Sequence, residues 1–287
     1  MKAATLMTAS SHTQDRFVSL YDLGDLKSGT LEVGIASRSE DILAAEELRY
    51  RVFFEEMGAP LTPQVAATHR DKDEFDDVCD HLLVVDHLPQ GGYKVVGTYR
   101  LIRRDAMKKI GRFYSDGEYD ISLIKQHQGE ILEVGRSCVD ADYRSRSVMQ
   151  MLWRGIGAYV TRFNIDILFG CASFHGTDPK EHAMALSYLY HYHLAPTELC
   201  TRALPHRYVE MNVMPKEAVD VKAAFVSLPA LIKGYLRLNG FIGAGAVVDQ
   251  EYNTTDVSII VKTDLINKKY AHRYGAERSS NQPASND

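Results

Sequence analysis

The sequence predicts an α+β sandwich in which helices cover both faces of a mixed, mainly antiparallel sheet. Apolar segments typical of strands are interspersed with amphipathic segments typical of helices, in the order strand, helix, three strands, helix, strand, helix and a final strand pair. Turn-forming residues at 89–92 join two of these strands directly, which indicates an antiparallel pair. With 287 residues, 45% of them hydrophobic and 25% charged, the chain has the composition of a globular protein.

The first strand is expected at residues 31–36, L-E-V-G-I-A. A helix follows, for which Ser37 provides an N-cap and Glu40, three residues later, completes a capping box. Apolar side chains then recur at helical spacing until Gly58, which ends the helix.

Residues 81–86 and 94–102 are expected to form the antiparallel pair. Residues 131–139, I-L-E-V-G-R-S-C-V, read as the next strand. Alternation places Glu133 and Ser137 on the same face of that strand if no bulge intervenes.

An amphipathic helix is expected over 148–163, and the nearly all-apolar residues 166–173 are expected to form a central strand. Asp178, followed by a proline, marks the start of a helix that runs to about residue 193. The last expected elements are a helix at 229–238 and strands at 246–249 and 257–261, with 200–225 left unassigned.

These elements suggest a single domain with polar ends. We expect a flexible N-terminal segment at 1–28, a core at 29–200, a C-terminal part of the same domain at 201–273, and a disordered tail at 274–287.

Charge and cysteine content exclude several functions. A net charge of −5 argues against a general nucleic-acid binder. The four cysteines show no C-x-x-C spacing, so no metal site is expected. No apolar run approaches the roughly 20 residues of a membrane span. We therefore expect a cytoplasmic protein that at most touches the inner face of the membrane.

Four charged motifs stand at the ends of apolar segments. They are R-Y-R-V-F at 49–53, D-E-F-D at 73–76, the arginine of G-T-Y-R-L at position 100, and E-V-G-R at 133–136. An enzyme that holds an amino acid and acylates its nitrogen needs carboxylates and guanidiniums arranged in this way around a central strand.

A charged loop, R-S-R-S-V-M, lies between the strand at 131–139 and the helix that follows. The element order with this loop resembles the GNAT-type N-acyltransferases, in which the helix N-terminus cradles phosphates of the acyl donor. That family's loop is usually glycine-rich, whereas this one has no glycine. Arginines and serines suit a single phosphodiester, as on acyl-carrier-protein, better than the pyrophosphate of coenzyme A.

Within that class, the charged motifs resemble those of the acyl-homoserine-lactone synthases over residues 45–175. The matching residues are Arg49 and Phe53, Asp73 and Asp76, Arg100, and Glu133 and Arg136. A second family, the bacterial L-ornithine N-α-acyltransferases, resembles the whole length, including residues 169–178, 229–238 and 253–257. This resemblance implies transfer of a 3-hydroxyacyl group from acyl-carrier-protein to L-ornithine, giving lyso-ornithine lipid, with no further cofactor.

The resemblance and the chemistry together suggest a role for each group. Glu133 is the first candidate for the general base and Asp256 the second. The substrate carboxylate would bind one of Arg49, Arg100 and Arg136, and Asp73 with Asp76 would bind an ammonium group; Phe53 completes the substrate set. The expected donor-binding residues are Ser137, Cys138, Val139, Arg144, Ser145, Arg146, Ser147 and Val148. Backbone N–H groups near Ser137 and Cys138 would stabilise the oxyanion.

Two alternatives stay open at this stage. The acceptor could be another amine, as in an autoinducer-type synthase. A non-catalytic module that binds acyl-carrier-protein or lipid would use the same scaffold without turnover.

Overall fold

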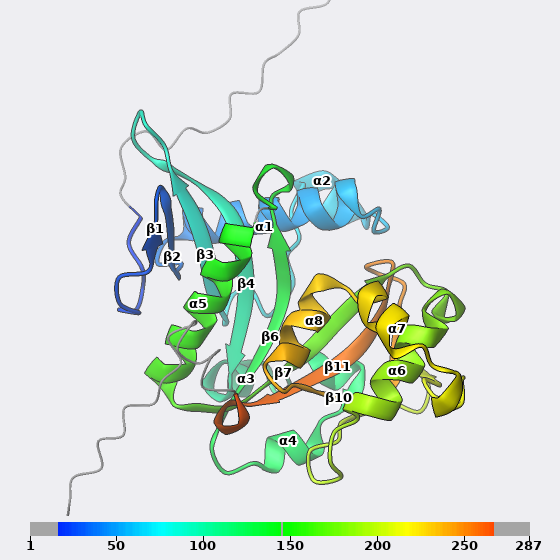
Figure 1. Cartoon of the computed structure of the whole chain (residues 1–287). Helices are drawn as coiled ribbons and strands as arrows, with labels where there is room; N and C mark the ends of the chain where they lie inside the picture. The colour runs from blue at the N-terminus through cyan, green and yellow to red at the C-terminus, as the bar shows by residue number, and fades with distance from the viewer. Residues whose placement is uncertain (1–16, 145, 267–287) are drawn as a thin grey trace, which may run out of the picture.

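The computed structural model describes residues 17–144 and 146–266, and its strands form one large sheet (Figure 1). The order across the sheet is β1-β2-β3-β4-β6-β7-β11-β10-β8-β5, and β9 also pairs with β10. The first half contains β1 (Lys27–Ser28), β2 (Leu31–Ile35), β3 (Asp80–His87), β4 (Tyr93–Arg103) and β6 (Glu130–Val139). The second half contains β7 (Ile165–His175), β11 (Thr254–Lys262), β10 (Phe241–Asp249), β8 (Arg202–Ala203), β9 (Tyr208–Val209) and β5 (Tyr119–Asp120).

Pairing is mainly antiparallel, as predicted. The central pair, β6 with β7, is parallel, and β8 meets β10 in a short parallel contact. β10 and β11, which come last in the sequence, continue the same sheet beyond β7. The C-terminal part therefore completes the sheet of the core.

Helices cover both faces of the sheet, as expected. The described helices are α1 (Ser39–Tyr50), α2 (Pro63–Thr68), α3 (Arg104–Ile110), α4 (Ser122–Gln126), α5 (Arg146–Phe163), α6 (Ala183–His193), α7 (Val221–Ser227) and α8 (Ala230–Arg237). Leu152 of α5 shares a buried cluster with Leu82, and Leu48 of α1 shares another with Leu83. Because successive residues of a strand point to opposite faces, α5 and α1 lie on opposite sides of β3. Figure 1 shows α5 in front of β3 and β4 and α1 behind them.

The first helix differs from its prediction at both ends. It begins at Ser39, with Arg38 at the N-cap position and no side-chain cap. Ser37 instead donates a hydrogen bond from Oγ to the carbonyl of Val18. The helix continues as a π-helix, η1 (Arg51–Glu56), before Gly58 turns the chain with φ +74°. Such π segments occur mainly at functional sites.

Part of the expected flexible N-terminal segment is ordered. Phe17 is 2% exposed and packs edge-on against Tyr93, and Leu20 donates its N–H to the carbonyl of Ile35. The polar composition of this segment predicted flexibility, but the single buried side chain of Phe17 holds part of it against the sheet. Residues 1–16 and the expected tail at 274–287 lie outside the described residues.

Four of the short elements were not predicted. β8, β9 and α7 begin within residues 200–225, and α2 follows the first helix. Each has fewer than eight residues, too few to show a hydrophobic period. Among the described residues, no helix combines the length and the apolar character needed to cross a bilayer.

Candidate active site

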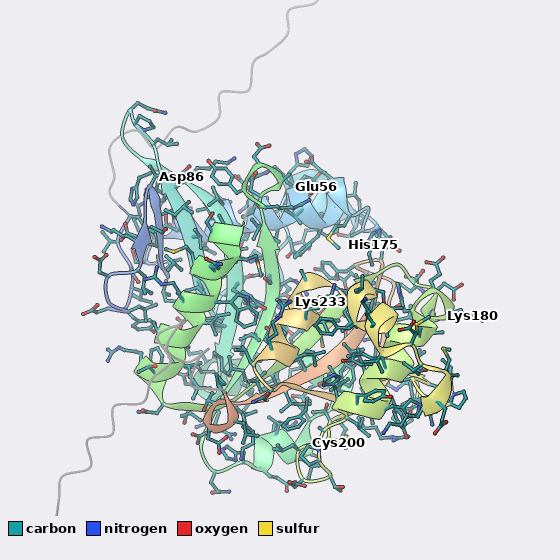
Figure 2. The ribbon with its side chains drawn as sticks, in the orientation of Figure 1. Glu56, Asp86, His175, Lys180, Cys200 and Lys233 are labelled. Carbon is teal, nitrogen blue, oxygen red and sulfur yellow. The ribbon has the colours of Figure 1, made fainter. Side chains whose placement is uncertain are left out.

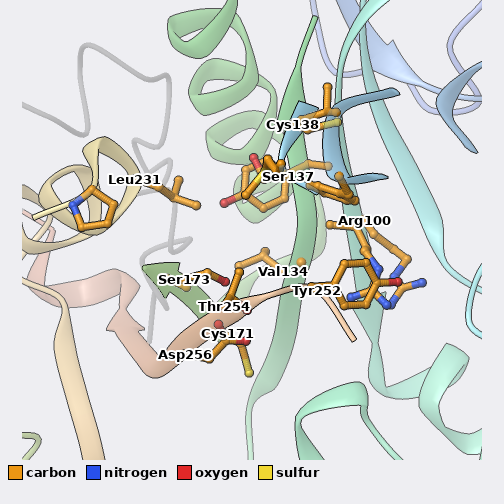
Figure 3. Close-up of a pocket in the computed structure, with 18 of the residues that line it drawn as sticks. Arg100, Val134, Ser137, Cys138, Cys171, Ser173, Leu231, Tyr252, Thr254 and Asp256 are labelled. Carbon is orange, nitrogen blue, oxygen red and sulfur yellow. The ribbon is translucent and has the colours of Figure 1, made fainter. Parts of the chain in front are cut away.

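The site is a cavity of about 570 Å³ at the point where β6 and β7 separate. Pairing of the two strands runs from Glu130↔Ile165 to Glu133↔Phe169 and stops there. The cavity fills the gap beyond that point. Figure 3 shows Leu231 of α8 on one side, Arg100 and Tyr252 on the other, and Asp256 on the strands below.

A β-bulge on β6 shapes this gap. On the β4 side, Thr98 faces Cys138 and Arg100 faces Gly135, so two residues of β6, Arg136 and Ser137, oppose a single residue of β4. Arg136 has φ +50°, in the left-handed region that non-glycine residues rarely adopt. The simple alternation expected for this strand is therefore broken at Arg136.

Close approach of the strands just before the gap depends on Gly170. A Cβ atom at this position would lie 2.2 Å from the carbonyl oxygen of Val134. The absence of a side chain allows β7 to pass β6 closely before the two diverge.

Beside the cavity lies a layer of buried ion pairs. Arg49 is fully buried; its Nε lies 2.7 Å from Asp71 Oδ2 and its Nη2 lies 2.8 Å from Asp76 Oδ1. Arg100 Nη1 lies 2.6 Å from Asp73 Oδ1. Burial alone would raise the pKa of Asp71, but the Arg136 and Arg49 guanidiniums outweigh burial and lower it.

Arg136 joins this layer to the cavity. Its Nη2 lies 3.3 Å from Asp73 Oδ2 and its Nε lies 3.4 Å from Asp71 Oδ2. The guanidinium also lies between two rings, 4.6 Å from the centroid of Tyr114 and 4.2 Å from that of Tyr252. These contacts fix the orientation of a cation that lines the cavity.

The predicted substrate set divides into two groups. Phe53, Arg100 and Arg136 line the cavity, whereas Arg49, Asp73 and Asp76 are not among its lining residues. The carboxylate oxygens of Asp73 and Asp76 form ion pairs with the arginines Arg49, Arg100 and Arg136. The expected ammonium-binding role of these two aspartates stays a prediction, and the arginines already supply opposite charge to both of them.

Glu133, the predicted base, lines the cavity at the last paired position of β6. Its Oε2 accepts the N–H of Tyr114 at 2.7 Å, and its Oε1 accepts the N–H of Ser115 at 2.6 Å together with the Ser115 hydroxyl. Burial raises the pKa of Glu133, although these hydrogen bonds oppose the shift. Tyr114 and Ser115 lie in the segment 105–128, where no motif pointed to a role.

A second group of carboxylates lies close to Glu133, linked to it through Ser115 and Cys171. Glu118, Asp249 and Asp256 are all buried, and an oxygen of each lies within 4.8 Å of the others. Burial, followed by the neighbouring Asp256, raises the pKa of Glu118. Asp256, the second predicted base, lines the cavity with Asp249. Glu118 was missed because it stands alone in an irregular segment.

Four of the predicted donor-binding residues line the same cavity. Ser137, Cys138, Val139 and Arg144 line the cavity. Arg144 forms an ion pair with Glu56, the last residue of η1, beside the loop that follows β6 (Figure 2). Burial raises the pKa of Cys138 to about 12, so this thiol is protonated at neutral pH and is a poor nucleophile.

The rest of the donor loop is only partly described. Val148 is fully buried, and its Cγ1 would lie 2.9 Å from a Cβ atom on Gly97, so its side chain belongs to the core and only its backbone can meet a donor. Ser147 is half-buried near the start of α5. Ser145 and the side chain of Arg146 lie outside the described residues.

Three features together define an N-acyltransferase core of the GNAT type. They are the parallel pair β6 and β7, its separation around a charged cavity, and the helix α5 that connects the two strands. A model of the acetyltransferase (GNAT) domain matches residues 48–154. Comparison over the whole chain identifies a more specific family within this class. The chain is 50% identical over 253 residues to the L-ornithine N(alpha)-acyltransferase of Brucella abortus, covering 87% of this chain and 90% of the relative.

The corresponding protein of Rhizobium meliloti is 45% identical, with 86% of this chain and 85% of that relative covered. The chain belongs to the L-ornithine N(alpha)-acyltransferase family, which confirms the predicted resemblance. Among solved structures, the AHL synthase LasI overlaps with a TM-score of 0.46 at 12% identity, covering 88% of this chain and 98% of that one.

Proposed function

We propose that this enzyme transfers a fatty acyl group from the thioester of acyl-carrier-protein to the α-amine of L-ornithine. Family membership supports the acceptor. The observation that carries the mechanism is the cavity itself, because one opening is bounded by the buried guanidiniums of Arg100 and Arg136, the carboxylate of Glu133 and the unpaired end of β6.

The α-carboxylate of the acceptor binds Arg136, assisted by Arg100. A guanidinium presents several donors in a fixed plane, which matches a carboxylate. Arg136 is already held by Asp71, Asp73 and two aromatic rings, so little entropy is lost when substrate binds.

Glu133 is the proposed base. The α-ammonium gives one proton to Glu133, directly or through one water, because only the neutral amine can attack. Its nitrogen lone pair forms the C–N bond to the thioester carbonyl. The resulting tetrahedral intermediate expels the phosphopantetheine thiolate as the C–S bond breaks. The nitrogen then loses its second proton, which passes to that sulfur, and Glu133 releases the first proton to solvent.

The oxyanion is placed beside β6. Beyond Glu133 this strand is no longer paired with β7, and Ser137 and Cys138 line the gap. Backbone N–H groups on this edge supply the donors that a developing negative oxygen requires.

The donor enters from the loop side. Arg144 lines the cavity close to the N-terminus of α5, and a cation with a helix N-terminus suits one phosphodiester. The acyl chain lies along the apolar wall, to which η1 contributes Val52 and Phe53 and α8 contributes Leu231. Because the product is amphiphilic, we further propose transient contact with the inner surface of the membrane.

Donor class is tested with purified protein, L-ornithine and either 3-hydroxyacyl-acyl-carrier-protein or the matching acyl-coenzyme A. We expect kcat/KM to be at least about 100-fold higher with the carrier protein, because only that donor carries a single phosphodiester. Equal use of both donors would refute the donor assignment. Binding of carrier protein without turnover of any amine would indicate a non-catalytic module.

A further inference from the structure

The buried carboxylate group beside the cavity comes from three separate segments. Glu118 follows the turn η2 (Tyr114–Gly117), Asp249 ends β10, and Asp256 lies on β11. Their exposed fractions are 3%, 6% and 5%. Burying three carboxylates together is unfavourable unless something positive meets them.

The existing partners do not balance this charge. Glu118 Oε2 accepts a hydrogen bond from Cys171 Sγ at 3.1 Å, and Glu118 Oε1 lies 3.8 Å from Arg207 Nη1. Asp249 Oδ1 accepts the N–H of Glu251 at 2.7 Å. Among the described residues, Arg207 is thus the one guanidinium within 4 Å of the three carboxylates; Arg136 acts on Asp256 from further away and does not offset burial.

Asp256 is the least satisfied member of the group. Its Oδ1 atom is fully buried and has no hydrogen-bond partner among the described residues. The side chain lines the cavity (Figure 3). A buried, unpaired carboxylate oxygen of this kind calls for a ligand.

We propose that Glu118, Asp249 and Asp256 bind the side-chain ammonium of the acceptor and so select an amino acid with a second, distal amine. This rests on the proposed function, since it assigns the other end of the same substrate. An ammonium group has three N–H donors, one for each carboxylate. Because Arg136 lines the same cavity as Asp249 and Asp256, the cavity presents both a cationic and an anionic group to a substrate that carries both charges.

A divalent cation is the competing occupant, and two contacts disfavour it. The Arg207 guanidinium lies near Glu118 and would repel a doubly charged ion more than a singly charged ammonium. Asp249 Oδ1 is already engaged by the backbone of the turn at Glu251. Mg²⁺ or Ca²⁺ would therefore need water to complete its shell of six or more oxygen ligands.

The proposal also separates the roles of the two predicted bases. If Asp256 holds the distal ammonium, Glu133 is left to deprotonate the α-amine. Loss of a base would reduce acylation of every acceptor alike, whereas loss of the ammonium site would reduce acylation only of acceptors that carry the distal charge.

The test compares L-ornithine with L-norleucine, in which a methyl group replaces the distal ammonium. We expect the wild-type protein to favour ornithine by about 1000-fold or more in kcat/KM, because a site built for a charged donor rejects an apolar analogue. In Asp256→Asn and in Glu118→Gln, this ratio should fall at least about 30-fold. Glu217→Gln, which removes an exposed carboxylate, should keep the wild-type ratio.

An unchanged ratio in both variants would overturn the proposal, including the case in which both substrates are lost in proportion. Wild-type protein that acylates neither substrate would instead refute the proposed function and, with it, this assignment. Ornithine-induced shifts in Tm provide a second readout that needs no turnover. After treatment with a chelator, a rise in Tm with Mg²⁺ or Ca²⁺ that is lost in Asp256→Asn, and no rise with ornithine, would make the cluster a metal site.

Discussion

Arg49 Nη2 lies 2.8 Å from Asp76 Oδ1, and neither side chain lines the cavity although both belong to the charged motifs of the sequence. The pair is part of a buried layer that fixes Arg136, whose guanidinium does reach the cavity. Half of the charged set therefore supports the other half, which lines the cavity. This division leads to different consequences for mutations in the two halves.

Removing Arg49 should lower the free energy of unfolding, because its side chain lies in the buried layer and does not line the cavity. In Arg49→Met, Asp71 and Asp76 each lose a buried cationic partner, and the free energy of unfolding should fall by about 3–5 kcal/mol. Chemical denaturation measures this loss. Arg51→Met is the control. Arg51 lies two residues after Arg49 and forms a partly exposed ion pair with Asp140, so its removal should lower the free energy of unfolding by less than about 1 kcal/mol. Equal losses in the two variants would contradict the importance of the buried layer.

Acid should destabilise the protein through the same layer. Arginines lower the pKa of Asp71 and of Asp73 in the folded state, despite burial. A lowered folded-state pKa stabilises the protein above the unfolded value of about 4, and this contribution is lost as pH falls through the folded value. Unfolding free energy measured from about pH 6 downward should fall most steeply below about pH 4. A Tyr252→Phe variant, which removes a hydrogen bond of Asp71, should lose stability at higher pH than wild type. An identical profile would count against this account.

Glu133 should matter for turnover rather than for donor binding. In Glu133→Gln the α-ammonium has no base, and kcat should fall about 100- to 10,000-fold while the affinity for acyl-carrier-protein is kept. Single-turnover kinetics and carrier-protein binding measure the two effects. Ser115→Ala removes one hydrogen bond to Glu133 without removing the carboxylate, and it should reduce kcat by less than about 10-fold. Full activity of Glu133→Gln would show that the base lies elsewhere.

The KM for acyl-carrier-protein should depend on the positive charges of the loop that follows β6. Arg144→Ala and Arg146→Ala should each raise KM for acyl-carrier-protein about 5- to 10-fold, and added salt should raise the wild-type KM in the same direction. Glu56→Gln frees Arg144 from its ion pair and serves as the opposite control, with KM unchanged or lower. If neither arginine variant nor salt changed KM, the phosphate would have to bind elsewhere.

Much of the sheet could be predicted because its strands are long and apolar, and the charged motifs mark β4 and β6 correctly. Gly135 inside the strand is a signal for a bulge, but the left-handed conformation of Arg136 depends on pairing with β4 and could not be predicted. The carboxylate cluster could not be predicted either. Glu118, Asp249 and Asp256 come from distant segments that only the folded sheet brings together.

The partners of Asp73 and Asp76 could not be predicted from composition. Both have the residue type for binding an ammonium, and in the structure three arginines form ion pairs with them. A sequence shows which charges are present, whereas the partner of each charge depends on tertiary contacts.

The most direct test of the central claim is the position of the new bond. Purified protein is given 3-hydroxyacyl-acyl-carrier-protein with an equimolar mixture of amino acids that includes L-ornithine, and the products are analysed by tandem mass spectrometry. The account predicts mainly ornithine acylated on its α-nitrogen, because the distal ammonium is held by the carboxylate cluster. A product acylated on the distal nitrogen, or on another amino acid, would contradict it.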